Sequence, residues 1–228
     1  MEYSEKPDLV INGVTTASGG DYGKVRIDGV GTVEGDIVAE SFDANGMTKV
    51  RGSLATDDMD CDGMITIDGH VSAGKSLVDG LMKIKGSLKA DRFTVNGMLK
   101  VKGDCEIEEL RMDGGFTIDG SMNVGRLYVM LNGQGRTREI GCESIQVRRK
   151  RRTPWAALIT WVLPRYAIEL HTSSIEGDDI DLEHTETEVV RGNRVMIGKG
   201  CRVDLVEYRT ELKVHPSAKI GKGVKIGG

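Results

Sequence analysis

A glycine repeat with a fixed spacing limits what this chain can fold into more than any other feature. Between Val25 and Met122 an Asp or Asn followed by Gly recurs six times, once every 17 residues. The pairs are Asp28-Gly29, Asn45-Gly46, Asp62-Gly63, Asp79-Gly80, Asn96-Gly97 and Asp113-Gly114. A second glycine follows six residues after each of them, from Gly35 to Gly120. Repeats of this length are typical of solenoids, in which each unit stacks on the next.

Three further positions of the repeat are apolar in all six copies. Two residues before the paired glycine stand Ile27, Ala44, Cys61, Val78, Val95 and Met112. Four residues after it stand Val33, Val50, Ile67, Ile84, Val101 and Ile118, and eight residues after it stand Ile37, Leu54, Val71, Leu88, Cys105 and Met122. Polar and apolar residues alternate between these columns, which is the period of a β-strand.

These columns predict an all-β chain folded as a parallel β-helix of about 17 residues per coil, with three short strands in each coil. The glycines and the missing helical period exclude a continuous helix. Each Asp/Asn-Gly pair supplies the positive φ that a tight turn needs. A hairpin array, which the same dipeptides favour, would not keep three apolar columns in one phase. Identical positions are therefore expected to stack, with a rise of about 4.8 Å per coil.

The repeat weakens at both ends and divides the chain into four parts. They are a polar tail (residues 1–8), the β-helix (9–147), a basic and Trp-containing insert (148–170) and a C-terminal region (171–228). The first coil, around Gly13, is one residue short, and Leu131-Asn132-Gly133 comes two residues late. We therefore expect a distorted coil at each of these places. The C-terminal region combines an acidic stretch with further coil-like sequence, which could extend the stack or cap it.

One outward column carries charges of both signs. Five residues after the paired glycine stand Glu34, Arg51, Asp68, Lys85, Lys102 and Asp119, so that opposite charges are adjacent in four of the five steps. Exposed ion pairs contribute about 0–1 kcal/mol each. The column is therefore expected to fix the register of the coils more than their stability. An ordinary solvated face is the alternative interpretation.

The insert is the least coil-like part of the chain. It opens with the cations Arg148, Arg149, Lys150, Arg151 and Arg152, and continues with Trp155, Leu158, Trp161 and Val162 between two prolines. Cations beside tryptophans suit anionic lipid headgroups, and a segment this short would lie on a bilayer rather than cross it. In the alternative interpretation the insert packs on the stack and its cations pair with the acidic stretch that follows. No second basic patch supports a nucleic-acid partner.

Composition and motifs indicate a chain without catalytic chemistry. The net charge is −4, and the four cysteines have no CxxC spacing, which excludes a zinc motif or disulfide framework and suits a reducing compartment. No phosphate-binding, nucleophile-elbow, metalloprotease or EF-hand motif is present in the sequence. We therefore predict no enzymatic activity, no catalytic residue, no metal and no cofactor. The enzymatic alternative is a hexapeptide acyltransferase that uses His215. The six-residue repeat near His215, however, lasts only about two units.

The repeat resembles that of the bactofilins, the bacterial polymer-forming cytoskeletal proteins. The residues that carry the resemblance are Ile27-Asp-Gly29, Val50-Arg-Gly-Ser-Leu54, Ile84-Lys-Gly-Ser-Leu88, Val95-Asn-Gly97 and Val101-Lys-Gly103, within a match over roughly residues 9–145. The resemblance implies a right-handed β-helix that assembles end to end into non-polar, nucleotide-independent filaments beside the membrane. Such filaments scaffold cell shape, motility or envelope-associated machinery. Many members carry an apolar N-terminal membrane-targeting segment, which Met1 to Lys6 does not resemble.

Unpaired strand edges at the two ends of the stack would favour such assembly. We place one candidate interface at Val10 and Ile11, and the other at Phe116, Met122 and Val124. The expected partners are further copies of the chain, alone or with a paralogue, and a membrane surface or envelope-associated protein. The expected location is the cytoplasm, including the inner face of the cell membrane. A non-polymeric adaptor whose coils display a binding face is the other alternative.

Overall fold

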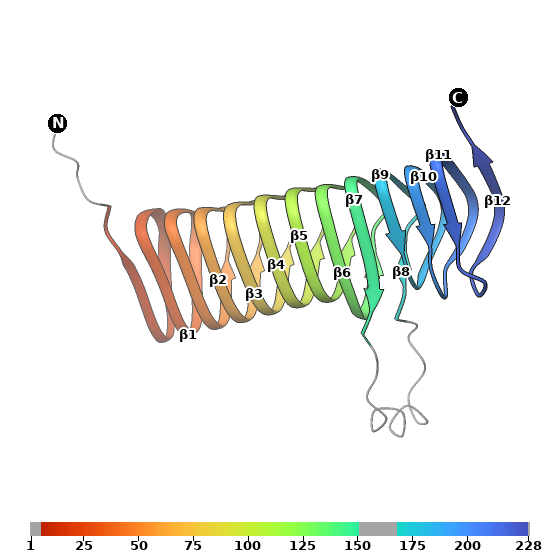
Figure 1. Ribbon diagram of the computed structural model, residues 1–228. Helices are drawn as coiled ribbons and strands as arrows, with labels where there is room; N and C mark the ends of the chain where they lie inside the picture. Colours follow the sequence, from red (N-terminus) through yellow and green to blue (C-terminus); the bar gives the residue numbers. More distant parts are fainter. Residues whose placement is uncertain (1–5, 151–167, 228) are drawn as a thin grey trace, which may run out of the picture.

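The computed structural model describes residues 6–150 and 168–227, and every regular element in these residues is a β-strand. The strands are β1 (Leu9–Val50), β2 (Leu54–Ile67), β3 (Val71–Ile84), β4 (Leu88–Val101), β5 (Cys105–Ile118), β6 (Met122–Arg136), β7 (Glu139–Arg149), β8 (Leu170–His171), β9 (Ser174–Leu182), β10 (Thr185–Ile197), β11 (Arg202–Val214) and β12 (Lys219–Lys225). The pairings between these strands are parallel, in the order β1 to β7, then β9 to β12. The strands stack into a solenoid of about ten turns, with the two termini at opposite ends (Figure 1). The predicted parallel β-helix is confirmed.

Each regular coil has three faces, each with two side chains that point inward. In the last coil of β1, for example, the inward pairs are Ile37 with Ala39, Phe42 with Ala44, and Thr48 with Val50. Consecutive outward residues between these pairs mark three corners. Hydrogen bonding continues around two of the corners, so β2 to β5 are each 14-residue strands bent into three segments. The chain leaves the ladder only at the third corner, before the next coil begins.

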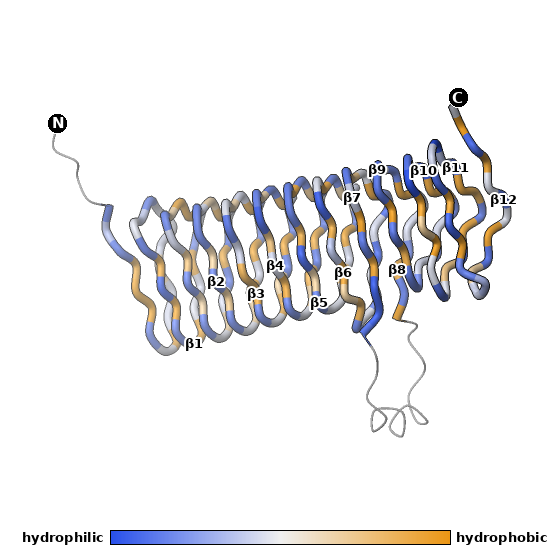
Figure 2. The backbone as a smooth tube through the Cα atoms, in the orientation of Figure 1, coloured by the Kyte–Doolittle hydropathy of each residue, from blue (hydrophilic) through white to orange (hydrophobic). Residues whose placement is uncertain are grey.

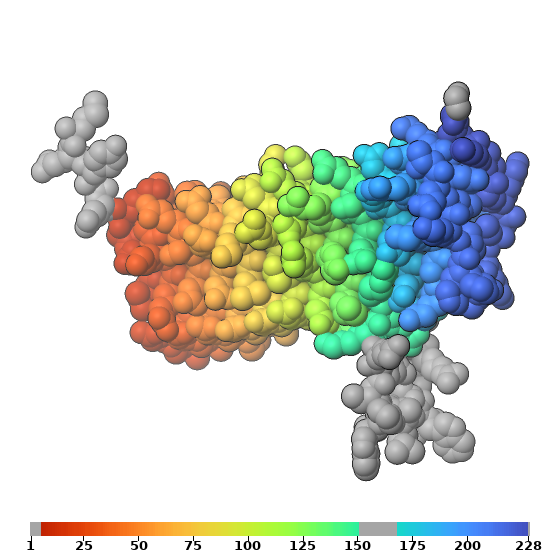
Figure 3. All heavy atoms as spheres, viewed as in Figure 1, coloured from red at the N-terminus to blue at the C-terminus, as the bar shows by residue number. Residues whose placement is uncertain are grey.

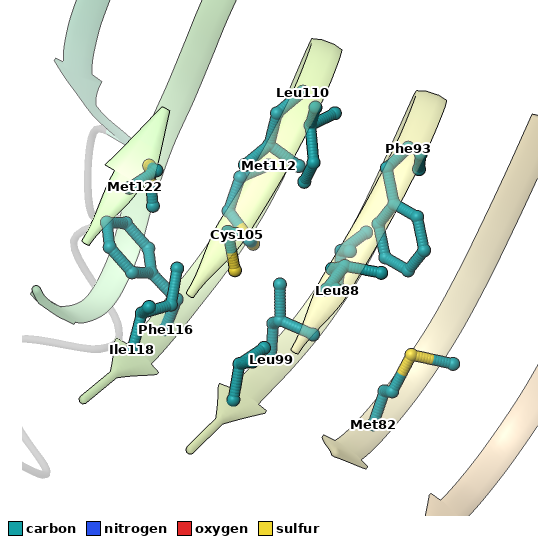
Figure 4. Packing of buried hydrophobic residues seen from close by; sticks show 14 of the residues in the cluster. Met82, Leu88, Phe93, Leu99, Cys105, Leu110, Met112, Phe116, Ile118 and Met122 are labelled. Carbon is teal, nitrogen blue, oxygen red and sulfur yellow. The ribbon is translucent and has the colours of Figure 1, made fainter. Parts of the chain in front are cut away.

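The core is a continuous column of apolar side chains along the stack axis. Figure 2 shows apolar and polar residues alternating along the coils, and Figure 4 shows how the inward side chains of successive strands pack, among them Phe93, Leu99 and Phe116. Each of these three is at most 1% exposed. Six inward columns therefore fill the stack, twice the number that the sequence alone indicated. The additional columns were not recognised because they mix residue types, for example Phe93 beside Ser76.

Glycine occupies two columns at the corners of the coils, for different physical reasons. The paired glycines have positive φ, for example +136° at Gly80, and a Cβ there would lie only 2.1 Å from the carbonyl oxygen of Gly63. Glycine is thus required both by its own backbone and by the coil beneath it. Gly52, from the second column, has no positive φ, but a Cβ would lie 2.4 Å from the Gly35 backbone. From Gly52 onward that column is required by close stacking of neighbouring coils alone, whereas its first member, Gly35, has a positive φ of +103° and no atom closer than 3.8 Å.

The insert leaves the stack at the Asp/Asn-Gly corner and the chain re-enters it at the following face. β6 pairs with β7 from Met122↔Ile140 to Leu131↔Arg149, and then with β8 through Gly135↔Leu170. Gly135 and Leu170 are about twice as far apart in the sequence as the paired residues of regular coils. The insert therefore adds roughly the length of one coil of chain to one corner. Residues 151–167 lie outside the described residues. The coil itself is completed by β7 and β8 together.

The C-terminal region extends the stack instead of capping its side. β9 pairs with β7, and β10, β11 and β12 follow in order, which gives the rod its full length (Figure 3). The step between coils falls to 15 residues from Asp179 in β9 to Arg194 in β10, and is again 17 residues from Asn193 to Thr210 in β11. The prediction of a second end near Phe116 is therefore wrong. The repeat in sequence becomes irregular there, but the stacking continues.

Candidate functional site: the two ends and the corner surfaces

Among the described residues, the first coil of the rod has one unpaired edge. Gly23 N donates to Pro7 O at 2.9 Å and Lys24 N donates to Asp8 Oδ1 at 2.8 Å, which closes the first coil on the second. In later coils the residue equivalent to Ser18 donates its backbone N–H to the preceding coil, as Asp68 N does to Val50 O at 2.9 Å. Among the described residues no coil precedes Ser18. Its N–H therefore faces the open end.

The C-terminal end of the rod is open in the same sense. Ile226 N donates to Tyr208 O at 2.8 Å, so the neighbouring Lys225, which pairs in register with Tyr208, turns its N–H and C=O away from the stack. Leu212 and Ile220 are packed against the core but only partly buried. No strand among the described residues lies beyond β12. Within the part of the chain that the structure describes, this end, and not the region of β5 and β6, is the second edge of the sheet.

The residues predicted to form assembly interfaces have different places in the structure. Phe116, Met122 and Val124 are 3% exposed or less, inside the stack between β4 and β7. Ile11 is buried in the first coil, whereas Val10 is 59% exposed on a side face of the rod. The assignment of Phe116, Met122 and Val124 is wrong, because these side chains lie inside the stack. Val10 and Ile11 belong to the first coil, so their part in an end interface stays a prediction. A charge at Ile11 would test the core of the end coil.

The described cations at the start of the insert, Arg148, Arg149 and Lys150, contact residues of the stack. The Arg148 guanidinium makes a two-pronged ion pair with Asp181, and Lys150 Nζ lies 2.9 Å from Asp113 Oδ2. Arg149 Nη1 lies 3.5 Å from His184 Nδ1. Hydrogen bonding to Asp181 raises the pKa of Arg148. The expected pairing with the acidic stretch thus holds for Arg148.

The rest of the predicted membrane-contact segment lies outside the described residues. It comprises Arg151, Arg152, Trp155, Leu158, Trp161 and Val162. The described residues contain no helix of the length and apolarity needed to cross a bilayer. Membrane contact therefore stays a prediction that rests on the sequence of this segment.

One cluster of two acids and a histidine has the composition of a metal site, but an arginine side chain already lies against both acids. Glu169, His171 and Glu186 offer ligand atoms within 4.8 Å of one another. The Arg202 guanidinium lies 2.9 Å from Glu169 Oε2 and 2.6 Å from Glu186 Oε2. These contacts lower the pKa of Glu186, first through its hydrogen bond from Arg202. The arrangement is a cross-coil ion-pair network that links β8, β10 and β11.

Three of the four cysteines are buried, and His215 lies at a turn. Cys61, Cys105 and Cys201 are buried free thiols, and burial raises the pKa of Cys105 to about 12. A thiol of this kind is not an activated nucleophile. His215, the residue of the acyltransferase alternative, is exposed at the last turn, where Ser217 N donates to its Nδ1 at 3.1 Å. It serves as a turn cap beside β12.

A shallow groove of about 630 Å³ crosses one side face of the rod. Its lining includes Ser144, Gln146, Arg126, Tyr128 and Arg194. The hollow arises because Ser144 is short and its in-register neighbour Arg126 is long. Its lining mixes acids, bases and apolar groups, so it lacks the convergent polar groups of a small-molecule site.

Comparisons with known proteins give relatives of part of the chain but no family. The chain is 32% identical over 108 residues to "Uncharacterized protein YhbE" of Bacillus subtilis (strain 168), covering 47% of this chain and 44% of that protein. It is also 32% identical over 108 residues to "Uncharacterized protein YhbF" of the same strain, covering 47% and 42%. The matched region is thus less than half the length of either relative. No family model and no solved structure matches the chain.

Proposed function

We propose that this protein is a structural scaffold that assembles end to end into filaments. The observation that carries the proposal is the pair of open sheet edges, at Ser18 and at Lys225, on a rod whose sides are otherwise closed by stacking. An unpaired parallel edge is a template for another chain. Because both ends are coils of the same fold, a second copy supplies matching strands without any change in conformation.

The resemblance to the bactofilins supports this proposal and suggests like-to-like contacts. If the N-terminal coils of two copies meet, and the C-terminal coils of two copies meet, two different self-complementary interfaces still propagate a filament. A head-to-tail filament would instead use both ends in every contact. We propose the like-to-like arrangement, with the filaments beside a membrane and the insert as the contact with it. The scaffolded machinery would then be envelope-associated, shape-determining or motility machinery.

The ends can be blocked one at a time by removing a single backbone donor. Proline lacks the N–H group, so Ser18→Pro blocks the N-terminal edge and Lys225→Pro blocks the C-terminal edge. Ser18→Ala and Lys225→Ala are the matched controls, because they change the same side chains and keep the N–H. Circular dichroism verifies that each variant keeps its β-structure.

Sedimentation and negative-stain microscopy of the full chain then distinguish the arrangements. Wild type and the alanine controls are expected to form filaments without nucleotide. Each single proline variant is expected to stop at end-to-end dimers, and the double variant is expected to form no end-to-end contact. Monomers from a single proline variant would show head-to-tail contacts. Filaments from the double variant, or a monomeric wild type at high concentration in moderate salt, would refute assembly through these edges.

A further inference from the structure

An exposed apolar ridge runs along one corner of the rod. The residue that follows the corner glycine is apolar in six successive coils: Val14, Val30, Met47, Met64, Leu81 and Met98. Met47, Met64, Leu81 and Met98 are direct neighbours in the ladder, and Val14 and Val30 follow the two glycines stacked before them. Six coils at about 4.8 Å spacing make this ridge about 24 Å long.

The ridge is solvent-exposed and has a defined end. Val14 is 84% exposed and Met47 is 55% exposed, whereas Leu81 and Met98, toward the other end of the ridge, are only partly exposed. The next position along the ladder is Gly115, which is buried. A Cβ at Gly115 would lie 2.9 Å from Gln134 O, because the extra residues of β6 fold over the corner at that point. The apolar line therefore runs from the N-terminal end to Met98 in β4.

The two sides of the ridge carry opposite charges. On the side that precedes the corner lie Asp28, Asp43, Asp60, Asp62 and Asp79, with Arg26 paired to Asp28 at 2.8 Å. On the side that follows it, two residues after the ridge position, lie Lys49, Lys83 and Lys100 and no acid in any of the six coils. The acids are crowded, since burial and the charges of Asp62, Asp43 and Asp79 raise the pKa of Asp60. The ridge thus separates an acidic flank from a basic one.

We infer that this ridge is a side-by-side docking surface for a second copy of the chain, with the two rods parallel. A two-fold axis parallel to the rods places ridge against ridge at the same level. It also places the acidic flank of each copy opposite the basic flank of the other. An antiparallel pair would oppose acid to acid and base to base. Charge complementarity therefore selects both the occupant and its direction.

The size of the ridge indicates a weak contact between single rods and a stronger one between filaments. Six side chains form a patch of a few hundred Å², below the roughly 800 Å² per partner of a standard stable interface. Methionine side chains adapt to an irregular opposing surface. In a filament the ridge recurs with every subunit, so many weak contacts act together. The pairing is distinct from end-to-end assembly, because it uses the corner and not the sheet edge.

Disulfide trapping tests the pairing and its direction. In a parallel pair Leu81 meets its own copy, whereas in an antiparallel pair centred on the ridge it meets Val30. Leu81→Cys is expected to form a symmetric cross-link under mild oxidation, because a disulfide needs Cβ atoms about 4 Å apart. Leu77→Cys is the control, since Leu77 is 37% exposed in the same coil but lies off the ridge. Leu81 is several coils from both ends, so end-to-end contacts do not cross-link it.

The cross-linking outcomes separate this inference from filament formation. More Leu81→Cys dimer than Leu77→Cys dimer, including in the Ser18→Pro/Lys225→Pro background, supports parallel pairing. Equal yields would overturn the ridge as a site for a second copy. A mixed cross-link between Leu81→Cys and Val30→Cys without the symmetric one would overturn the parallel direction.

Charge substitution gives a second measurement that does not depend on oxidation. Met47→Lys with Met64→Lys is expected to abolish the concentration-dependent dimer in sedimentation of the end-blocked protein. It should also separate filament bundles into single filaments without shortening them. Val38→Lys, at a residue that is 46% exposed away from the ridge, is the matched control. Equal loss in the control, or no loss in the double variant, would contradict the inference.

Discussion

The regular coils of β2 to β5 and the irregular coils of β9 to β12 build one stack by different means. In the first region every ladder step is 17 residues and each Asp/Asn-Gly corner has a positive-φ glycine. In the second region the steps vary from 15 to 17 residues, and His184 has a φ of +48° where no glycine stands. The interior is nevertheless the same, because Ile180, Leu182 and Val195 are at most 1% exposed.

This difference shows which part of the repeat specifies the fold. Corner length and corner chemistry vary along the rod, whereas the inward side chains of each face remain apolar and stacked. Cross-coil ion pairs are frequent in the irregular region, for example Arg194 with Asp179 and Arg191 with Glu207, both at 2.5 Å. We conclude that inward packing specifies the stack, and that corners and charges adjust its register.

The largest expected effect tests whether the two regions share one core. Leu110 in β5 and Leu182 in β9 are both fully buried, so replacing either with alanine leaves a cavity of the same chemistry. Each substitution is expected to destabilise the protein by about 2–5 kcal/mol, measured by urea unfolding with circular dichroism. A much smaller cost at Leu182 would mean that the C-terminal coils are only loosely attached.

A smaller effect is expected at the corners. Gly80→Ala combines a positive φ with a backbone collision against Gly63, whereas Gly13→Ala has a positive φ of +83° and nothing within 4 Å. Strain of this kind costs about 1–3 kcal/mol, so both variants should lose stability and Gly80→Ala should lose more. Urea unfolding of the two variants would measure the difference. Equal losses would mean that the neighbouring coil moves aside freely, and that close stacking does not require glycine.

A stabilising substitution is expected inside the regular region. Ser76 points inward beside Phe93, is 3% exposed, and its hydroxyl has no hydrogen-bond partner among the described residues. Removing an unsatisfied buried hydroxyl relieves a desolvation cost of about 1–3 kcal/mol, offset in part by the lost volume. Ser76→Ala should therefore raise the urea midpoint slightly. A clear decrease would show that the hydroxyl is satisfied in solution.

The smallest effect concerns the exposed ion pairs of both regions. Hydrogen bonds from Lys85 and Arg194 lower the pKa of Asp68 and Asp179 respectively. A lowered folded-state pKa gives stability that is present above the unfolded value of about 3.9 and is lost as the pH falls through the folded value. Asp179→Asn should thus weaken the pH dependence of stability in acid and change little at neutral pH. Thermal melts of both proteins at acidic and at neutral pH would measure this, and a large loss at pH 7 would contradict it.

The sequence predicted the architecture because the regular half repeats without insertions. It indicated only three of six inward columns, since the others mix Phe, Met, Thr, Ser and Gly, as at Phe93 and Ser76. It misplaced the second end, because shorter steps and the insert hide the periodicity after Met122 while the core continues. The ridge was not predicted, although the sequence shows an apolar residue after each of six corner glycines. An outward position was expected to be polar.

Order along the filament axis tests the central claim most directly. If the coils of successive subunits stack across open ends, oriented filaments should give a strong meridional reflection at about 4.8 Å, parallel to the filament axis. A subunit of about ten coils is then about 48 Å long, so the like-to-like filament should repeat every two subunits, or about 96 Å. Filaments with both spacings would confirm edge-to-edge assembly. Filaments whose 4.8 Å spacing lies across the axis, or a protein that stays monomeric at high concentration, would contradict it.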